Sequence, residues 1–133
     1  MRQIRNGVFE TNSSSVHSIT MCMKDEYDRW ETDNLFLFTG GGYFYPENNR
    51  PQKNHFYTKE EAIAFERLSK FAPSENFDWS NDEAVMNMLH DNEWYDFDYW
   101  DDYYGNNYET FENSFITPSG EKVIAFGYTG YDG

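Results

Sequence analysis

Asn34-Leu35-Phe36-Leu37-Phe38-Thr39 is a short apolar run that ends at three successive glycines, Gly40 to Gly42. An apolar run of this length, bounded by a turn signal, is typical of a β-strand. Residues 40–54, which follow it, are rich in Gly, Asn and Pro and are predicted to form a surface loop. The run therefore predicts a strand that is stopped by a turn.

A second strand is predicted on the N-terminal side of this run, over Ser15–Met23. Its side chains alternate between two faces, and a period of two is the pattern of a strand. One face carries His17, Ile19, Met21 and Met23, and the other carries Val16, Ser18, Thr20 and Cys22.

Two helices are predicted on the C-terminal side of the apolar run. Thr58-Lys59-Glu60-Glu61 has the pattern of a capping box, in which the first side chain and the fourth satisfy each other's backbone amides. An apolar stripe follows, and Pro73 ends it. The stripe consists of Ala62, Phe65, Leu68 and Phe71, widened by Ile63. A second box, Ser80-Asn81-Asp82-Glu83, predicts another helix that runs to about Asp91.

The last predicted element is a β-hairpin, with strands at Phe115–Thr117 and Val123–Tyr128 and a turn at 118–121. Together these elements predict an α+β fold, in which two helices pack on one side of an antiparallel sheet. The length of 133 residues and the absence of an internal repeat predict a single domain, residues 1–133.

The composition indicates a folded chain in a reducing compartment. The chain has 12 Phe, 11 Tyr and 4 Trp residues, which bury enough area to build a core with few aliphatic residues. A single cysteine, Cys22, excludes an internal disulfide framework. The first ten residues carry positive charge without an apolar run behind it, and no segment approaches a membrane span. We therefore expect a cytoplasmic protein without a membrane partner.

Charge is distributed very unevenly along the chain. The net charge is −14, and residues 71–133 hold fourteen acids against one basic residue, Lys122. Between Lys70 and Lys122 there is no Lys or Arg at all. Affinity for phosphates comes from Lys and Arg, so direct binding to nucleic acid or to an anionic membrane is disfavoured. Any macromolecular partner is expected to be basic.

Glu93–Tyr104, with the sequence EWYDFDYWDDYY, concentrates five acids and seven aromatic residues in twelve positions. As a strand, it would place Tyr95, Phe97 and Tyr99 on one face. As a helix, it would gather a stripe of aromatic residues and set Asp98 and Asp102 one turn apart on another face. In both conformations the rings anchor inward and the carboxylates project outward.

The functional interpretation of this segment is nucleic-acid mimicry. Closely spaced carboxylates can occupy a cationic groove that otherwise binds phosphates, and aromatic residues can stack on arginine. The alternative is that the rings form the core and the acids form an ordinary solvated face. The predicted partner-binding residues are Asp91, Glu93, Trp94, Asp96, Asp98, Trp100, Asp101, Asp102, Tyr103, Tyr104, Glu109 and Glu112.

Features that suggest catalysis or metal binding are weaker. Ser13, Ser14 and Ser15 lie close in sequence to His17 and Cys22, but serine-rich loops are common in turns. The histidines His17, His55 and His90 lack metal-ligand spacing. We therefore expect no catalytic residue, metal or cofactor. An alternative hypothesis is a small enzyme or nucleotide-binding protein that uses the Asn12–His17 segment.

The segment Arg5–Ser18, RNGVFETNSSSVHS, resembles the start of small uncharacterised bacteriophage proteins. The resemblance covers about a tenth of the chain and implies an origin in a phage or prophage genome, so the protein would act in the cytoplasm of an infected bacterial host. The acidic, aromatic composition is similar in kind to phage-encoded DNA mimics and to anti-CRISPR or anti-restriction inhibitors. Together the two likenesses imply an inhibitor of a basic nucleic-acid-binding protein of host defence.

Overall fold

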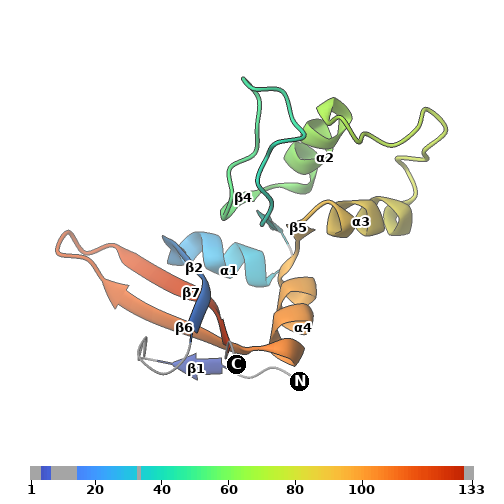
Figure 1. Ribbon diagram of the computed structural model, residues 1–133. Coiled ribbons are helices and arrows are strands. Elements are labelled where there is room, and N and C mark those ends of the chain that lie inside the picture. The colour runs from blue at the N-terminus through green and yellow to red at the C-terminus, as the bar shows by residue number, and fades with distance from the viewer. Residues whose placement is uncertain (1–3, 7–14, 33, 131–133) are drawn as a thin grey trace.

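The computed structural model describes residues 4–6, 15–32 and 34–130, which contain four helices and seven strands (Figure 1). The mixture of helices with mainly antiparallel strands confirms the predicted α+β class. In chain order the elements are β1 (Ile4–Asn6), β2 (Ser15–Met23), α1 (Lys24–Glu31), β3 (Phe36–Phe38), β4 (His55–Tyr57), α2 (Lys59–Leu68), α3 (Asp82–Asp91), β5 (Trp94–Tyr95), α4 (Phe97–Asn107), β6 (Glu109–Ile116) and β7 (Lys122–Gly130).

The larger sheet has the strand order β1–β6–β7–β2. β7 pairs antiparallel with β6 and β2, while the short β1 lies parallel to β6. β2 has its predicted bounds, and the predicted hairpin is present, although β6 begins at Glu109 rather than Phe115. Gly127 of β7 has no room for a side chain, because a Cβ there would lie 2.0 Å from the carbonyl oxygen of Ser18. Glycine at this position therefore lets β7 pair closely with β2.

The smaller sheet has β3 at its centre, between β4 and β5. All three residues of β3 are buried, and they enter two different cores: Leu37 packs in one, while Phe36 and Phe38 pack in the other. The two predicted helices, α2 and α3, do pack on one side of this sheet. The structure extends that prediction, because a second sheet and the helices α1 and α4 cover its other side (Figure 1).

The first core lies between the larger sheet, α1, α4 and one face of the smaller sheet. Trp30 of α1 is fully buried in it, with the ring centroids of Phe97, Trp100 and Phe126 at distances of 5.0, 5.4 and 5.0 Å. The indole nitrogen of Trp30 donates a hydrogen bond to the carbonyl oxygen of Tyr95 at 3.0 Å. Aromatic side chains therefore supply the area that this core buries.

The second core lies beneath α2 and α3. The predicted capping box begins α2: the backbone amide of Glu61 donates to Thr58 Oγ1 at 3.1 Å, and the amide of Thr58 donates to Glu61 Oε1 at 2.9 Å. Ala62 is buried in the core, but Leu68 is 50% exposed and ends the helix. Phe71, which we assigned to the same apolar stripe, lies beyond the helix and is 63% exposed. The stripe therefore faces the core from Ala62 to Phe65, and its last two residues do not.

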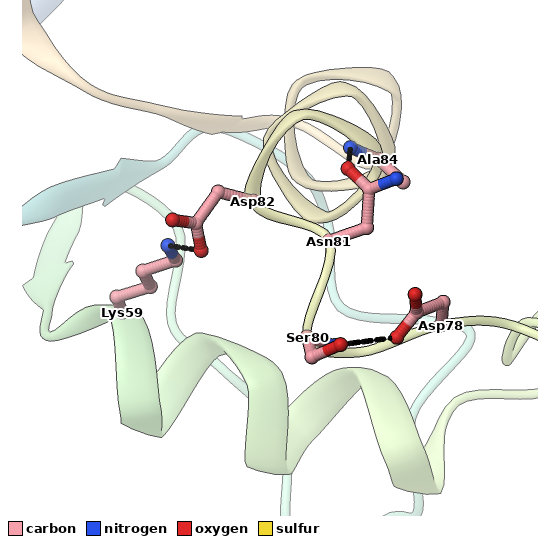
Figure 2. A network of polar contacts seen from close by, with 6 residues as sticks. All are labelled: Lys59, Asp78, Ser80, Asn81, Asp82 and Ala84. Atoms are coloured by element: carbon pink, nitrogen blue, oxygen red, sulfur yellow. Dashed lines mark hydrogen bonds and ion pairs between the residues drawn. The ribbon is translucent and has the colours of Figure 1, made fainter.

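The start of α3 differs by one residue from the sequence prediction (Figure 2). Asn81 is the N-cap, and its Oδ1 accepts a hydrogen bond from the backbone amide of Ala84 at 3.1 Å. Ser80, the predicted cap, instead donates to Asp78 Oδ1 from its amide at 3.0 Å and from its hydroxyl at 2.5 Å. The side chain of Ser80 thus closes the loop before the helix.

Glu66 of α2 is a fully buried carboxylate in the second core. It accepts hydrogen bonds from the Tyr45 hydroxyl, from Trp94 Nε1 at 3.0 Å and from Asn92 Nδ2 at 2.5 Å. Burial, and then the hydrogen bond to Glu66, raises the pKa of Tyr45 above its usual value. The carboxylate therefore joins the loop after β3, the end of α3 and the start of β5.

Candidate partner-binding site

The predicted partner-binding residues lie on the end of α3, on β5, on α4 and on β6. Glu93–Tyr104, which we call the acidic aromatic segment, combines the two conformations that the sequence allowed. Its first part contains the two-residue strand β5, and the rest belongs to the helix α4. The helical spacing turns Phe97 and Trp100 into the first core and leaves Asp98 and Asp102 exposed. At these four positions the rings face the core and the carboxylates face solvent, as the sequence predicts.

Two of the predicted contact residues belong to the core. Trp94 is fully buried in the second core, and Trp100 is 5% exposed in the first. A buried ring cannot stack on a partner's side chain, so we correct the role of both residues from partner binding to packing. Tyr104 is half-buried, and its ring stacks on Tyr128 with centroids 3.9 Å apart. Tyr104 therefore also contributes mainly to packing.

The carboxylate of Asp96 contacts a histidine of the same protein. Its Oδ1 lies 2.6 Å from Nε2 of His90, and both side chains are largely buried. His90 also stacks on the ring of Tyr99, with centroids 4.0 Å apart. Asp96 and His90 therefore link the end of α3 to the start of α4.

Four of the predicted acids are exposed, and none of them lies within ion-pair distance of a Lys, Arg or His of the described residues. They are Asp91, Glu93, Asp98 and Asp102. By contrast, Asp82 at the start of α3 lies 3.4 Å from the ammonium of Lys59 (Figure 2). The four acids thus carry charge that the described cations do not neutralise.

The remaining predicted residues have mixed environments. Asp101, Glu109 and Glu112 are half-buried. Tyr103 is 49% exposed, and its ring is nearly parallel to that of Tyr99 at a centroid distance of 6.4 Å. The exposed acids of α4 therefore stand beside a short row of tyrosine rings.

A groove of about 150 Å³ adjoins Asp91 and Glu93. The loop after β3 and the loop after α2 form its other walls, and three of its rings are unusually exposed: Tyr43 at 75%, Phe44 at 51% and Phe71 at 63%. The rings of Phe44 and Phe71 meet edge to face with centroids 4.6 Å apart. We call this feature the aromatic groove. Sequence reasoning missed it, although three aromatic residues in a loop rich in Gly, Asn and Pro were a usable signal.

Glu93 has a backbone conformation that side chains rarely adopt, with φ of 73°. It directly follows the C-cap of α3, a position that favours glycine. The carbonyl oxygen of Glu93 accepts hydrogen bonds from the amide of Thr39 at 2.9 Å and from its hydroxyl at 3.1 Å. Its carboxylate packs beside Gly40, where a Cβ would lie 3.1 Å from Glu93 Oε1. The hydrogen bonds from Thr39 therefore fix the main chain at Glu93.

A larger cleft, of about 410 Å³, lies on the other side of Glu93. Lys53, Thr39, Tyr104 and Tyr128 contribute polar groups to its lining. Burial, followed by the hydrogen bond to Tyr128, raises the pKa of Tyr104, so this hydroxyl stays neutral at ordinary pH. The cleft mixes one cation with one anion and has no catalytic pair that the described contacts reveal.

The alternative site at Asn12–His17 lies mainly outside the described residues, since only 15–17 of it belong to the described part, at the start of β2. Within the described ranges there is no cluster of three or more potential metal ligands. Nor does any helix in those ranges have the length and apolar character needed to cross a membrane.

Comparison of the chain with protein-family models, with curated proteins and with solved structures found no match.

Proposed function

We propose that this protein is a phage-encoded inhibitor that binds the cationic nucleic-acid-binding surface of a host defence protein. The observation that carries the proposal is the set of four exposed carboxylates at the junction of α3, β5 and α4, which no described cation neutralises. The resemblance of residues 5–18 to bacteriophage proteins supports the phage origin.

The chemistry of this surface suits a partner that binds phosphates. Asp98 and Asp102 stand one helical turn apart, about 6 Å along the axis, so that they offer a short row of negative charge. Arginine and lysine side chains that donate hydrogen bonds to phosphate oxygens can also donate them to carboxylate oxygens. Tyr103, exposed beside this row, provides a ring on which an arginine can stack. The net charge of −14 attracts a basic partner over a distance and accelerates encounter.

The test is capture of bacterial proteins on the immobilised protein, followed by competition with duplex DNA. We expect a captured nucleic-acid-binding protein that is released as salt rises, because exposed charges are screened over about 8 Å at physiological ionic strength. We also expect the phage protein to displace DNA from it.

The decisive variant is Asp98→Asn combined with Asp102→Asn, which keeps shape and removes two charges. Loss of two charge-assisted contacts should weaken binding at least tenfold, at about 1.4 kcal/mol per decade. Asp25→Asn combined with Glu47→Gln removes the same charge from exposed positions elsewhere and should bind like the wild type. If both double variants lose affinity equally, net charge rather than this site is responsible. If neither does, the acids are only a solvated face.

A further inference from the structure

The aromatic groove combines exposed carboxylates with exposed aromatic rings. Its mouth holds two exposed carboxylates, Asp91 and Glu93, and three large rings that remain exposed to solvent. Clustered exposed rings mark binding surfaces more often than ordinary surface. No Lys, Arg or His belongs to the lining of this groove. An apolar ligand would leave both carboxylates desolvated and unpaired, which is strongly unfavourable.

The chain between the two acids is anchored to the second core. Asn92, which lies between them in sequence, donates from Nδ2 to the buried carboxylate of Glu66. With Asn92 anchored inward, Asp91 and Glu93 flank it and remain exposed. The groove is therefore organised before any ligand arrives, and preorganisation of this kind reduces the entropy lost on binding.

The backbone at position 93 is unfavourable for a side chain. Its φ is 73°, and glycine or asparagine is the usual choice at this position after a helix. A glycine at position 93 would therefore remove the carboxylate and relieve the backbone at the same time.

We propose that the aromatic groove binds the guanidinium group of an arginine side chain of the partner protein. This inference rests on the proposed function and names the group that the site recognises. The volume of about 150 Å³ holds roughly five water molecules, which suits one side chain. Arginine fits better than lysine, because its planar fork pairs with carboxylates and stacks on rings, whereas a lysine ammonium is a compact, strongly hydrated charge.

The test is a titration of the isotope-labelled protein with N-acetyl-arginine amide, followed by NMR. We expect saturable shifts centred on the amides of Gly41, Gly42, Asp91 and Glu93. N-acetyl-lysine amide should bind more weakly, and the neutral N-acetyl-citrulline amide should not bind. Shifts spread over every acidic region, or equal affinity for the arginine and lysine probes, would overturn the proposal.

Variants at position 93 separate binding from folding. Glu93→Gln should weaken arginine binding at least tenfold with little change in melting temperature. Glu93→Gly should abolish binding and yet raise the melting temperature, because glycine accepts the positive φ. Asp25→Asn combined with Glu47→Gln is the control and should bind the probe like the wild type. Unchanged probe affinity in Glu93→Gln contradicts the proposal.

The failure of this inference and the failure of the proposed function are distinguishable, because the small probe tests the groove and the captured partner tests the acids of α4. A partner that depends on Asp98 and Asp102, in a protein that does not bind the arginine probe, contradicts only the groove. A groove that binds arginine, in a protein that never displaces DNA from its partner, contradicts only the inhibitor function.

Discussion

Glu66 shows how much of this fold depends on one side chain. It is fully buried, and its carboxylate accepts hydrogen bonds from Tyr45, Asn92 and Trp94, which come from three separate segments. Removing an acceptor from buried donors leaves them without partners and is more destabilising than the loss of one exposed hydrogen bond. This single residue therefore supports both the second core and the strand that leads to the site.

We expect Glu66→Gln to lower the free energy of unfolding by about 2–3 kcal/mol, because an amide nitrogen replaces one of the two acceptor oxygens. Urea denaturation measures this change. Glu60→Gln is the matched control, since Glu60 lies on the same helix and is exposed. If the two variants have equal stability, the buried carboxylate is not a structural support.

At the scale of the element, the sequence predicted those segments whose own pattern was strong. β2 and the start of α2 were predicted closely, because alternation and a capping box are local signals. α1, β1 and β4 were not predicted, and the segment that contains β5 was left open between strand and helix. The strands among them are two or three residues long and depend on their partners, and α1 buries only Tyr27 and Trp30 in eight residues. Such elements arise from tertiary packing, which local periodicity does not report.

Two residues can be compared as the N-cap of α3: Asn81, which caps the helix in the structure, and Ser80, which the sequence predicted. Asn81→Ala removes the acceptor for the amide of Ala84 and should lower the free energy of unfolding by about 1 kcal/mol. Ser80→Ala should lower it less, because Ser80 bonds to Asp78 in an exposed loop. Thermal or urea unfolding of the two variants decides between them. A larger effect at Ser80 would restore the cap that the sequence predicted.

At the scale of the whole molecule, sequence reasoning located the acidic part of the site but not its shape. The run of acids and rings from Glu93 to Tyr104 was visible, whereas its tertiary burial was not: Trp94 and Trp100 are interior, and Tyr103 is exposed. The shape of the aromatic groove was missed for a different reason. Tyr43 and Phe44 are visible in their loop, but Phe71 is far away in sequence and meets Phe44 only in the folded protein.

Burial also predicts how the whole protein responds to alkali. Burial is the largest cause of three raised pKa values. It raises the pKa of the Cys22 thiol from 9.0 to about 12, and it raises the pKa of the Tyr45 and Tyr104 hydroxyls above 10.0. The unfolded chain releases these protons at lower pH than the folded chain. The stability that they contribute is therefore complete below about pH 9 and is lost as the pH rises above it.

We expect the free energy of unfolding to fall above about pH 9, with a slope of at most about 1.4 kcal/mol per pH unit for each group. Urea titrations at fixed ionic strength measure it. Tyr45→Phe combined with Tyr104→Phe should flatten the slope above pH 10, where free tyrosine ionises. A slope identical to that of the wild type would show that these hydroxyls do not control alkaline unfolding.

The central strand β3 has a consequence for how the protein exchanges its amide hydrogens with solvent. Leu37 belongs to one core, and Phe36 and Phe38 belong to the other, so neither core can open without disturbing this strand. If α2 or α4 opens locally, the core on the opposite face of β3 still packs against the strand. Its amides therefore exchange only when both halves of the molecule open together, and their exchange rate reports the free energy of global unfolding.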